Sequence, residues 1–345
     1  MRLLIIGGTR FLGRHLMQAA LARGDQVTLF NRGQSWSGPL PAGVALHQGD
    51  RRVSLAALAE GRWDAVIDCC AYLPGEVQSM ARALQGRVHR YALVSSISAY
   101  ADASVPAAED APLAALPPGA DASTVTGDTY GPLKAACEQA LLAAWGTAHS
   151  LILRPGLIVG PHDPTGRFTW WPARLARAAA QGPGSSVLAP GPAEAPVQCI
   201  DVRDLSAFIL QALAAGGSGA YNLTSAPGAA TMASLLQACA AAAGAAPEWH
   251  WVPGDWLQAQ GVQPWMELPL WLPQVGEHAA FMQVPVARAL AAGLSLRPLA
   301  DTAADTLAWW QGLPAEQQAF PQTGLAPARE DALCRAWAGR NSPPA

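Results

Sequence analysis

The chain has 345 residues, 51% of them hydrophobic and 14% charged, which is typical of a globular protein and excludes a disordered one. Its net charge of −3 gives no basic surface for nucleic acid, and no apolar run reaches the ~18 residues that a membrane span needs. The six cysteines and seven histidines lack metal-ligand spacing, so no metal site is predicted, and unpaired cysteines of this kind indicate a reducing, cytoplasmic location.

The N-terminal 30 residues have the layout of a dinucleotide-binding unit. A buried strand over Arg2–Ile6 runs into the turn Gly7-Gly8-Thr9-Arg10-Phe11-Leu12-Gly13, and apolar residues at helical spacing follow until Gly24. A second strand covers Gln26–Phe30. Glycines let the backbone approach a pyrophosphate, and the helix N-terminus near Phe11 offers free amides. We therefore predict cofactor contacts from Gly7, Gly8, Thr9, Arg10, Phe11, Leu12 and Gly13.

Two arginines favour NADP over NAD as the cofactor. The second strand ends in Phe30-Asn31-Arg32, with no acid where a carboxylate would bind a ribose 2′-hydroxyl. An arginine at that place accommodates a 2′-phosphate, and Arg10 stands at a helix N-terminus, where a cation is disfavoured unless an anion binds. NAD remains the alternative if Arg10 and Arg32 are merely solvated.

The following segments alternate between strand and helix, which predicts a doubly wound parallel α/β sheet. Strands are expected at 44–48, 65–70, 91–94, 150–153, 197–202 and 221–223, and helices at 54–60, 76–85, 129–145, 202–213, 231–243, 284–292 and 299–310. Stretches 102–125 and 183–196 are expected to be loops. Ligands of such folds bind at the carboxyl ends of the strands. Further candidate site residues at these ends are Asn31, Arg32, Asp50, Arg51, Cys70, Ala71, Ser96 and Pro155.

The segment Tyr130-Gly-Pro-Leu-Lys134 is the strongest catalytic candidate. Lys134 is the only lysine among the 22 Lys and Arg residues. Residues four apart share one helix face, so the ammonium would lie beside the phenol, and a fixed cation lowers the pKa of a tyrosine. Tyr130 would then serve as an acid or base toward a carbonyl or alcohol oxygen. Pro132 fits a first helical turn, which places the start of the helix near Thr129.

Taken in order, these motifs resemble the extended short-chain dehydrogenase/reductase superfamily, in the branch of NAD(P)-dependent epimerases and dehydratases. The resemblance covers roughly residues 1–312 and includes Ser95-Ser96, Arg154-Pro155 and the segment from Ile200 to Asp204. It implies a Ser96, Tyr130, Lys134 triad in which Ser96 bonds the reacting oxygen and Lys134 holds the nicotinamide ribose. It also implies a Rossmann sheet with a smaller C-terminal substrate lobe and a homodimer formed through the Tyr130 helix.

Several positions depart from the family pattern. Ile97 and Ser98 replace the Asp-Glu pair of the dehydratases, which disfavours elimination. Leu157 stands where nucleotide-sugar enzymes commonly carry asparagine, and Val197 and Gln198 stand where an arginine often binds a diphosphate. The Gly-Gly-Thr-Arg-Phe-Leu-Gly form also resembles an atypical branch that includes proteins proposed to bind RNA.

The sequence therefore predicts an NADP(H)-dependent oxidoreductase or epimerase for a small, sugar-like substrate, with no nucleic-acid or membrane partner. The alternative is a non-catalytic, RNA-binding or cofactor-sensing protein on the same fold. We expect a dinucleotide-binding domain over 1–159 that also receives 197–224, and a substrate lobe over 160–196 and 225–313. A polar tail with one short helix would cover 314–345.

Overall fold

A computed structural model describes residues 1–36 and 38–341 and divides into two compact units. The first unit combines residues 1–158, 202–224 and 284–296, and the second combines 159–201, 225–283 and the chain from 297 onward. Residues 284–296 thus lie in the first unit, whereas the sequence grouped them with the C-terminal lobe. The segment expected to be a tail belongs to the second unit, and its last four residues lie outside the described range.

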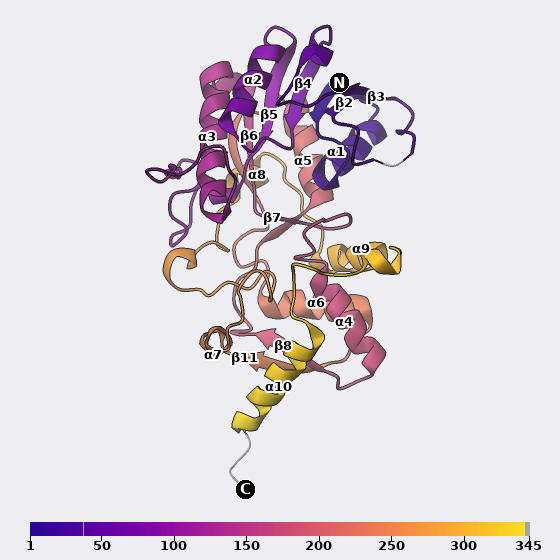
Figure 1. The fold of residues 1–345 in the computed structure, drawn as a ribbon, viewed down its shortest axis with the longest axis vertical. Coiled ribbons are helices and arrows are strands. Elements are labelled where there is room, and N and C mark those ends of the chain that lie inside the picture. The colour runs from indigo at the N-terminus through magenta and orange to yellow at the C-terminus, as the bar shows by residue number, and fades with distance from the viewer. Residues whose placement is uncertain (37, 342–345) are drawn as a thin grey trace. The chain divides into compact units, whose positions relative to one another are not determined.

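The first unit is built on a seven-stranded sheet in which every neighbouring pair runs parallel (Figure 1). The strand order is β10-β6-β5-β4-β1-β2-β3. Their bounds are β1 (Arg2–Ile6), β2 (Gln26–Asn31), β3 (Val44–Gln48), β4 (Trp63–Asp68), β5 (Val88–Val94), β6 (Ser150–Pro155) and β10 (Gly219–Leu223). The order reverses between β1 and β4, the place where doubly wound sheets bind ligands. The predicted doubly wound Rossmann sheet is confirmed.

Helices cover both faces of this sheet. They are α1 (Phe11–Ala22), α2 (Pro74–Leu84), α3 (Gly127–Trp145), α5 (Val202–Ala214) and the short α8 (Ala287–Ala291). Helices α2 and α3 pack together on one face, and α1 and α5 pack together on the other (Figure 1). Both faces of the sheet are therefore buried, which explains why its strands are almost continuously apolar.

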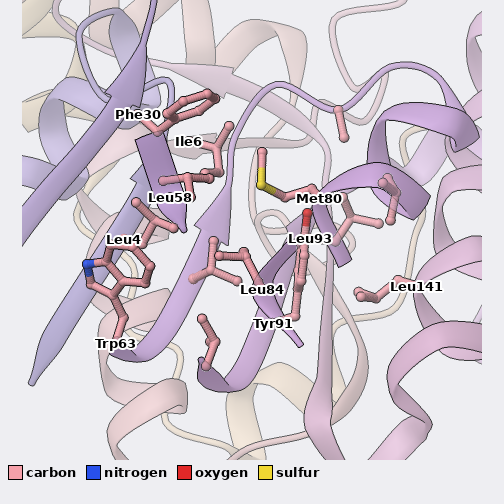
Figure 2. Close-up of a cluster of buried hydrophobic side chains, with 14 of the residues drawn as sticks. Leu4, Ile6, Phe30, Leu58, Trp63, Met80, Leu84, Tyr91, Leu93 and Leu141 are labelled. Atoms are coloured by element: carbon pink, nitrogen blue, oxygen red, sulfur yellow. The ribbon is translucent and has the colours of Figure 1, made fainter. Parts of the chain in front are cut away.

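The core beneath α2 and α3 fixes the strands that carry the site. Figure 2 shows Leu4 and Ile6 of β1 converging with Tyr91 and Leu93 of β5 and with Met80 of α2. None of these five side chains is more than 1% exposed. Because close-packed interiors yield little to small displacements, the carboxyl ends of the strands form a rigid platform.

The second unit is mainly helical. Its elements are α4 (Trp170–Gln181), α6 (Met232–Ala243), α7 (Gly254–Ala259), α9 (Leu299–Gln311), α10 (Pro327–Asn341), β8 (Ser186–Pro190), β9 (Cys199–Asp201) and β11 (Glu248–Val252), while β7 (Leu157–Val159) spans the boundary. Helix α6 packs against both α4 and α9, and β8 pairs in parallel with β11.

Four local predictions differ from the structure. The expected loop 183–196 contains β8, because β11 supplies its main-chain partners from about 60 residues away. Residues 54–60 form only one 3₁₀ turn, Ala56–Leu58. Helix α8 has five residues where a longer helix was expected. Helix α3 begins at Gly127, so Pro132 lies in its second turn and not in its first.

Among the described residues, no helix is both long and apolar enough to cross a membrane.

Candidate active site

The residues selected from the sequence gather at one edge of the sheet. Gly7 follows β1, Arg32 follows β2, Cys70 lies just after β4 and Ser96 lies just after β5. Since these strands are parallel neighbours in the sheet, their carboxyl ends meet at the same edge. Pro155 is the last residue of β6 and lies at this edge too. The fold thus brings together side chains that are far apart in sequence.

Lys134 is buried at this edge, with only 4% of its surface exposed. Its Nζ donates to the main-chain oxygen of Ala71 at 2.8 Å and to that of Val94 at 2.6 Å. These oxygens belong to the segment after β4 and to the last residue of β5. An ammonium has three donors, so one N–H remains after both carbonyls are satisfied. The ammonium is therefore held in place by two main-chain dipoles.

Tyr130 lies one turn before Lys134 on α3 and is half-buried. The start of the helix is fixed by Thr126, whose side chain accepts from the Thr129 N–H, while Thr129 Oγ1 accepts from the Thr126 N–H at 2.8 Å. Gly131 follows Tyr130 and packs directly on the carbonyl of Ser98, where a larger side chain would collide. The tyrosine is therefore held against the turn that begins after β5.

Ser96 begins that turn. It is 8% exposed, and its Oγ accepts from the Ser98 N–H at 3.1 Å. No acceptor for the Ser96 O–H occurs among the residues that the structure describes, so this hydrogen is available to donate. The neighbouring Ser95 hydroxyl points elsewhere and donates to Glu138.

Tyr72 is a further candidate for the site that the sequence analysis did not select. The Lys134 Nζ lies 5.2 Å from the centre of the Tyr72 ring, within cation–π range, and 42% of Tyr72 is exposed. Partial burial and the proximity of Tyr130 raise the pKa of Tyr72, so its phenol stays protonated near neutrality. The available signal in the sequence was its place beside Ala71, two residues after the strand predicted at 65–70.

A buried polar network lies behind the lysine. Glu138, one further turn along α3, accepts from Arg154 Nε at 3.0 Å and Nη2 at 2.6 Å. Arg154 Nη1 also donates to the Tyr100 hydroxyl at 2.9 Å, and Tyr100 donates to Asn222 Oδ1 at 2.6 Å. Glu138, Arg154 and Asn222 are each less than 5% exposed. The network ties α3 to β6, to β10 and to the segment after β5, and it fixes the position of the helix that carries Tyr130 and Lys134.

The glycine turn fits the pyrophosphate of a dinucleotide. Gly7 and Gly8 have φ of 100° and 82°, the left-handed region that favours glycine. A Cβ on Gly13 would lie 2.5 Å from the Gly8 nitrogen, so helix and turn can approach this closely only because residue 13 is glycine. Arg10 occupies the N-cap position of α1 without a side-chain hydrogen bond, and the first turn carries no acid. The main-chain N–H groups in the first turn of α1 are therefore available to bind an anion.

The end of β2 is bound to this turn. Asn31 Nδ2 donates to the Gly7 oxygen at 2.8 Å, and Asn31 Oδ1 accepts from the Gly33 N–H at 2.8 Å. The amide of Asn31 thus supports the loop. Arg10 and Arg32 are both exposed, and within residues 1–36 and 38–341 neither guanidinium has a hydrogen-bond or ion-pair partner.

Polar side chains of the loop after β3 form hydrogen bonds within the protein. The Asp50 carboxylate accepts from the Arg52 N–H at 2.9 Å. Arg51 turns inward and forms two hydrogen bonds with Asp68, at 2.7 and 2.8 Å, while Tyr91 donates to the same carboxylate at 2.6 Å. The Arg51 guanidinium is therefore engaged within the protein.

Cys70 packs against the glycine turn. Its Sγ lies 3.7 Å from the Ile6 oxygen, and a Cβ placed on Gly7 would be 3.7 Å from the same sulfur. Burial raises the pKa of the Cys70 thiol to about 11, so the thiol is uncharged near neutral pH where it packs against the turn.

A profile of the NAD dependent epimerase/dehydratase family matches residues 3–224. This chain belongs to that family. It is therefore an NAD-dependent enzyme of the epimerase type, which confirms the resemblance indicated by its motifs. The match runs from β1 to β10 and so reaches every strand of the Rossmann sheet. No curated protein matches the chain significantly.

Solved structures share the fold at low sequence identity. A putative epimerase from Burkholderia cenocepacia has a TM-score of 0.61 and 20% identity, over 89% of this chain and 97% of that one. The UDP-glucose 4-epimerase of Thermus thermophilus, in complex with NAD, has a TM-score of 0.61 and 21% identity, over 91% and 100%. The UDP-N-acetylglucosamine 4-epimerase of Bacillus cereus has a TM-score of 0.61 and 16% identity, over 90% and 100%. At these identities the likeness is one of fold.

Proposed function

We propose that this protein is an NADP(H)-linked epimerase or oxidoreductase that acts at a hydroxyl- or carbonyl-bearing carbon through Ser96, Tyr130 and Lys134. The observation that carries the proposal is the burial of the chain's single lysine, bonded to two main-chain oxygens one helical turn from Tyr130. A buried ammonium is costly, and its retention here is explained by a task that arginine would not perform.

Each member of the triad has a distinct part in proton transfer. Tyr130 exchanges a proton with the reacting oxygen, and the nearby Lys134 charge favours negative charge on the phenol oxygen as the proton leaves. The free O–H of Ser96 donates to the same reacting oxygen. The remaining N–H of Lys134 would hold a ribose hydroxyl of the cofactor when the cofactor is bound. A bound nicotinamide would supply the hydride chemistry, and the protein supplies orientation.

The proposed substrate is a small polyol or sugar-like molecule. Proteins of similar structure include UDP-glucose and UDP-N-acetylglucosamine 4-epimerases. By the family resemblance, however, Leu157 stands where nucleotide-sugar enzymes commonly carry asparagine, and Val197 and Gln198 stand where an arginine often binds the diphosphate. We therefore propose a substrate without a nucleoside diphosphate group.

Loss of the Tyr130 hydroxyl tests the catalytic assignment. Tyr130→Phe removes the acid–base group, and general acid–base catalysis contributes roughly 10²–10⁴-fold, so kcat should fall by that factor. The dissociation constant of the cofactor, measured by calorimetry, should stay within about threefold of wild type. Turnover that survives the substitution would refute the assignment.

The proposed NADP preference rests on Arg10 and Arg32, two exposed guanidinium groups near the glycine turn that have no partner in the part of the chain that the structure describes. Arg32→Ala should lower the ratio of NADP to NAD affinity by about tenfold or more, because charge-assisted hydrogen bonds contribute roughly 1.5–3 kcal/mol. Arg82→Ala, which removes an exposed charge from α2, is the matched control. An unchanged ratio in Arg32→Ala would refute the preference.

A further inference from the structure

The second unit carries an aromatic cluster with one arginine above it. The Trp265 and Phe281 rings meet edge to face, with centres 5.8 Å apart, and His278 contacts Phe281 at 6.3 Å. The Arg167 guanidinium carbon lies 5.7 Å from the centre of the Trp265 ring. Arg167, Trp265 and Phe281 are all partly exposed, and the adjacent Met266 is 40% exposed. Arg167, Trp265 and Phe281 are together called the Arg167 cluster below.

The donors of Arg167 are free to bind a ligand. Within residues 1–36 and 38–341, no protein oxygen accepts a hydrogen bond from its guanidinium. The nearby Asp163 carboxylate attracts the Arg167 charge, and it accepts hydrogen bonds from the Thr165 N–H at 2.8 Å and from Thr165 Oγ1 at 3.0 Å. Arg154 in the first unit also lies over an aromatic ring, at 4.8 Å, yet its donors are bound to Glu138. A guanidinium on an aromatic face keeps its N–H edge available, and that edge matches a carboxylate or phosphate.

The Trp265 ring is held in place by a strained backbone. Trp265 has a φ of 67°, a region that bulky side chains rarely adopt because it is sterically strained. The conformation is secured by the Trp265 N–H, which donates to the Trp271 oxygen at 3.0 Å. Trp271 is itself only 2% exposed. Strain of this kind persists where the surroundings over-determine it, and ligand-binding residues are common among such cases.

The segment before α10 forms hydrogen bonds with both the loop that carries Arg167 and the loop that carries Trp265. Thr323 Oγ1 donates to the Thr165 oxygen at 3.0 Å, on the loop that carries Arg167. The next residue, Gly324, donates its N–H to the Met266 oxygen at 2.7 Å, beside Trp265. Helix α10 is anchored by Glu330, which is 1% exposed and accepts from Arg174 Nε at 2.6 Å. The guanidinium and the ring are therefore preorganised, which lowers the entropic cost of binding.

We propose that Arg167, Trp265 and Phe281 form a subsite that binds an organic anion, a carboxylate or a phosphate ester, through its charged group and an adjoining flat or apolar face. The anion pairs with the free edge of Arg167, and the apolar face covers the exposed rings of Trp265 and Phe281. The inference deepens the proposed function, on which it rests, because it adds a carboxylate or phosphate ester and an apolar face to the small, sugar-like substrate proposed above.

Binding of three simple probes tests the subsite. The probes are 3-phenylpropionate, phenyl phosphate and the neutral 3-phenylpropanamide, titrated into the full chain by ligand-observed NMR and calorimetry. At least one anion should bind the wild type at least about tenfold more tightly than the amide, since a charged hydrogen bond contributes roughly 1.5–3 kcal/mol. The stronger of the two anions identifies the charged group. Equal affinity for all three probes, or no saturable binding of either anion, would overturn the proposal.

Three variants locate the binding. Arg167→Gln should reduce anion affinity to that of the amide, and Arg167→Lys, which keeps the charge without the planar fork, should fall between. Arg340→Gln is the matched control, because it removes another guanidinium that lies 6.0 Å from a tryptophan, Trp337, in the same unit. Circular dichroism confirms that each variant is folded. Undiminished anion binding by folded Arg167→Gln, or an equal loss in Arg340→Gln, would overturn the proposal.

The test of the anion subsite can fail independently of the test of the catalytic triad. Tyr130→Phe should bind the anions as the wild type does, because Tyr130 lies in the other unit. Turnover retained by Tyr130→Phe would refute the triad while leaving the subsite intact. Unaltered anion binding in Arg167→Gln would refute the subsite while leaving the triad intact.

Discussion

Glu138 provides the sharpest test of how this site is supported. The carboxylate sits two helical turns after Tyr130 and one after Lys134, on the same face of α3. Its side chain is 1% exposed and that of Arg154 is 5% exposed. Glu138→Gln keeps the size and shape of the side chain but places an amide against a guanidinium that cannot lose its proton.

The expected cost follows from the burial of the pair. Removing one partner of a buried ion pair leaves an uncompensated charge and costs about 3–5 kcal/mol of unfolding free energy. For a unit of this size, each kcal/mol corresponds to a shift of about 2–4 °C, so the melting temperature should fall by roughly 6–20 °C. Exposed pairs contribute only about 0–1 kcal/mol. The pair of Arg2 with Asp64, 54% and 39% exposed, is the matched control.

Thermal unfolding followed by far-UV circular dichroism measures this difference. Asp64→Asn should move the transition by no more than a few degrees, and Glu138→Gln should move it by several times as much. The double variant Glu138→Leu, Arg154→Met removes both charges and should recover part of the loss. A drop in Glu138→Gln no greater than that in Asp64→Asn would refute the reasoning. So would a double variant that is no more stable than Glu138→Gln.

Three further outcomes follow from the same edge of the sheet. Gly13→Ala should abolish measurable cofactor binding, because the new Cβ would lie 2.5 Å from the Gly8 nitrogen; calorimetry showing wild-type affinity would contradict the close approach. Tyr72→Leu should lower kcat by about tenfold, since a cation–π contact with Lys134 contributes roughly 0.5–2 kcal/mol, whereas Tyr72→Phe should retain most activity; steady-state kinetics that rank the two equally would exclude this role for the ring. Alkylation of Cys70 by iodoacetamide, followed by peptide mass spectrometry, should accelerate up to a pH of about 11, because the thiolate reacts and burial raises the pKa of this thiol to about 11. A rate that levels off near the usual thiol pKa of about 8.5 would show that the group is not buried as described.

Local patterns in the sequence predicted much of the nucleotide-binding half. The strand, glycine turn and helix over the first 24 residues depend on neighbours within a few positions, as do the apolar strands that follow. For the same reason the Tyr130–Lys134 pair could be placed on one helix face before any fold was known. Boundaries were less accurate: the cap formed by Thr126 and Thr129 starts α3 two residues earlier than Pro132 had indicated.

The second unit was harder to predict, because its elements are defined by distant partners. Strand β8 exists through its pairing with β11, and the Glu330 carboxylate accepts the Leu188 N–H across 142 residues. The polar composition after Leu313 suggested a tail, yet Glu330 is 1% exposed and pairs with Arg174. Local composition does not reveal that Glu330 is buried, because its partner Arg174 lies 156 residues away in the sequence.

The sequence by itself determined that a single lysine follows a tyrosine by one helical turn and that a glycine turn follows the first strand. Only the tertiary structure decided what the lysine touches. Its two carbonyl partners lie 63 and 40 residues away, and Tyr72 covers it from the segment after β4. Helical spacing is set by covalent geometry and can be counted along the chain. The partners of a buried ammonium are set by how parallel strands align their carboxyl ends, which depends on the packing of the whole sheet.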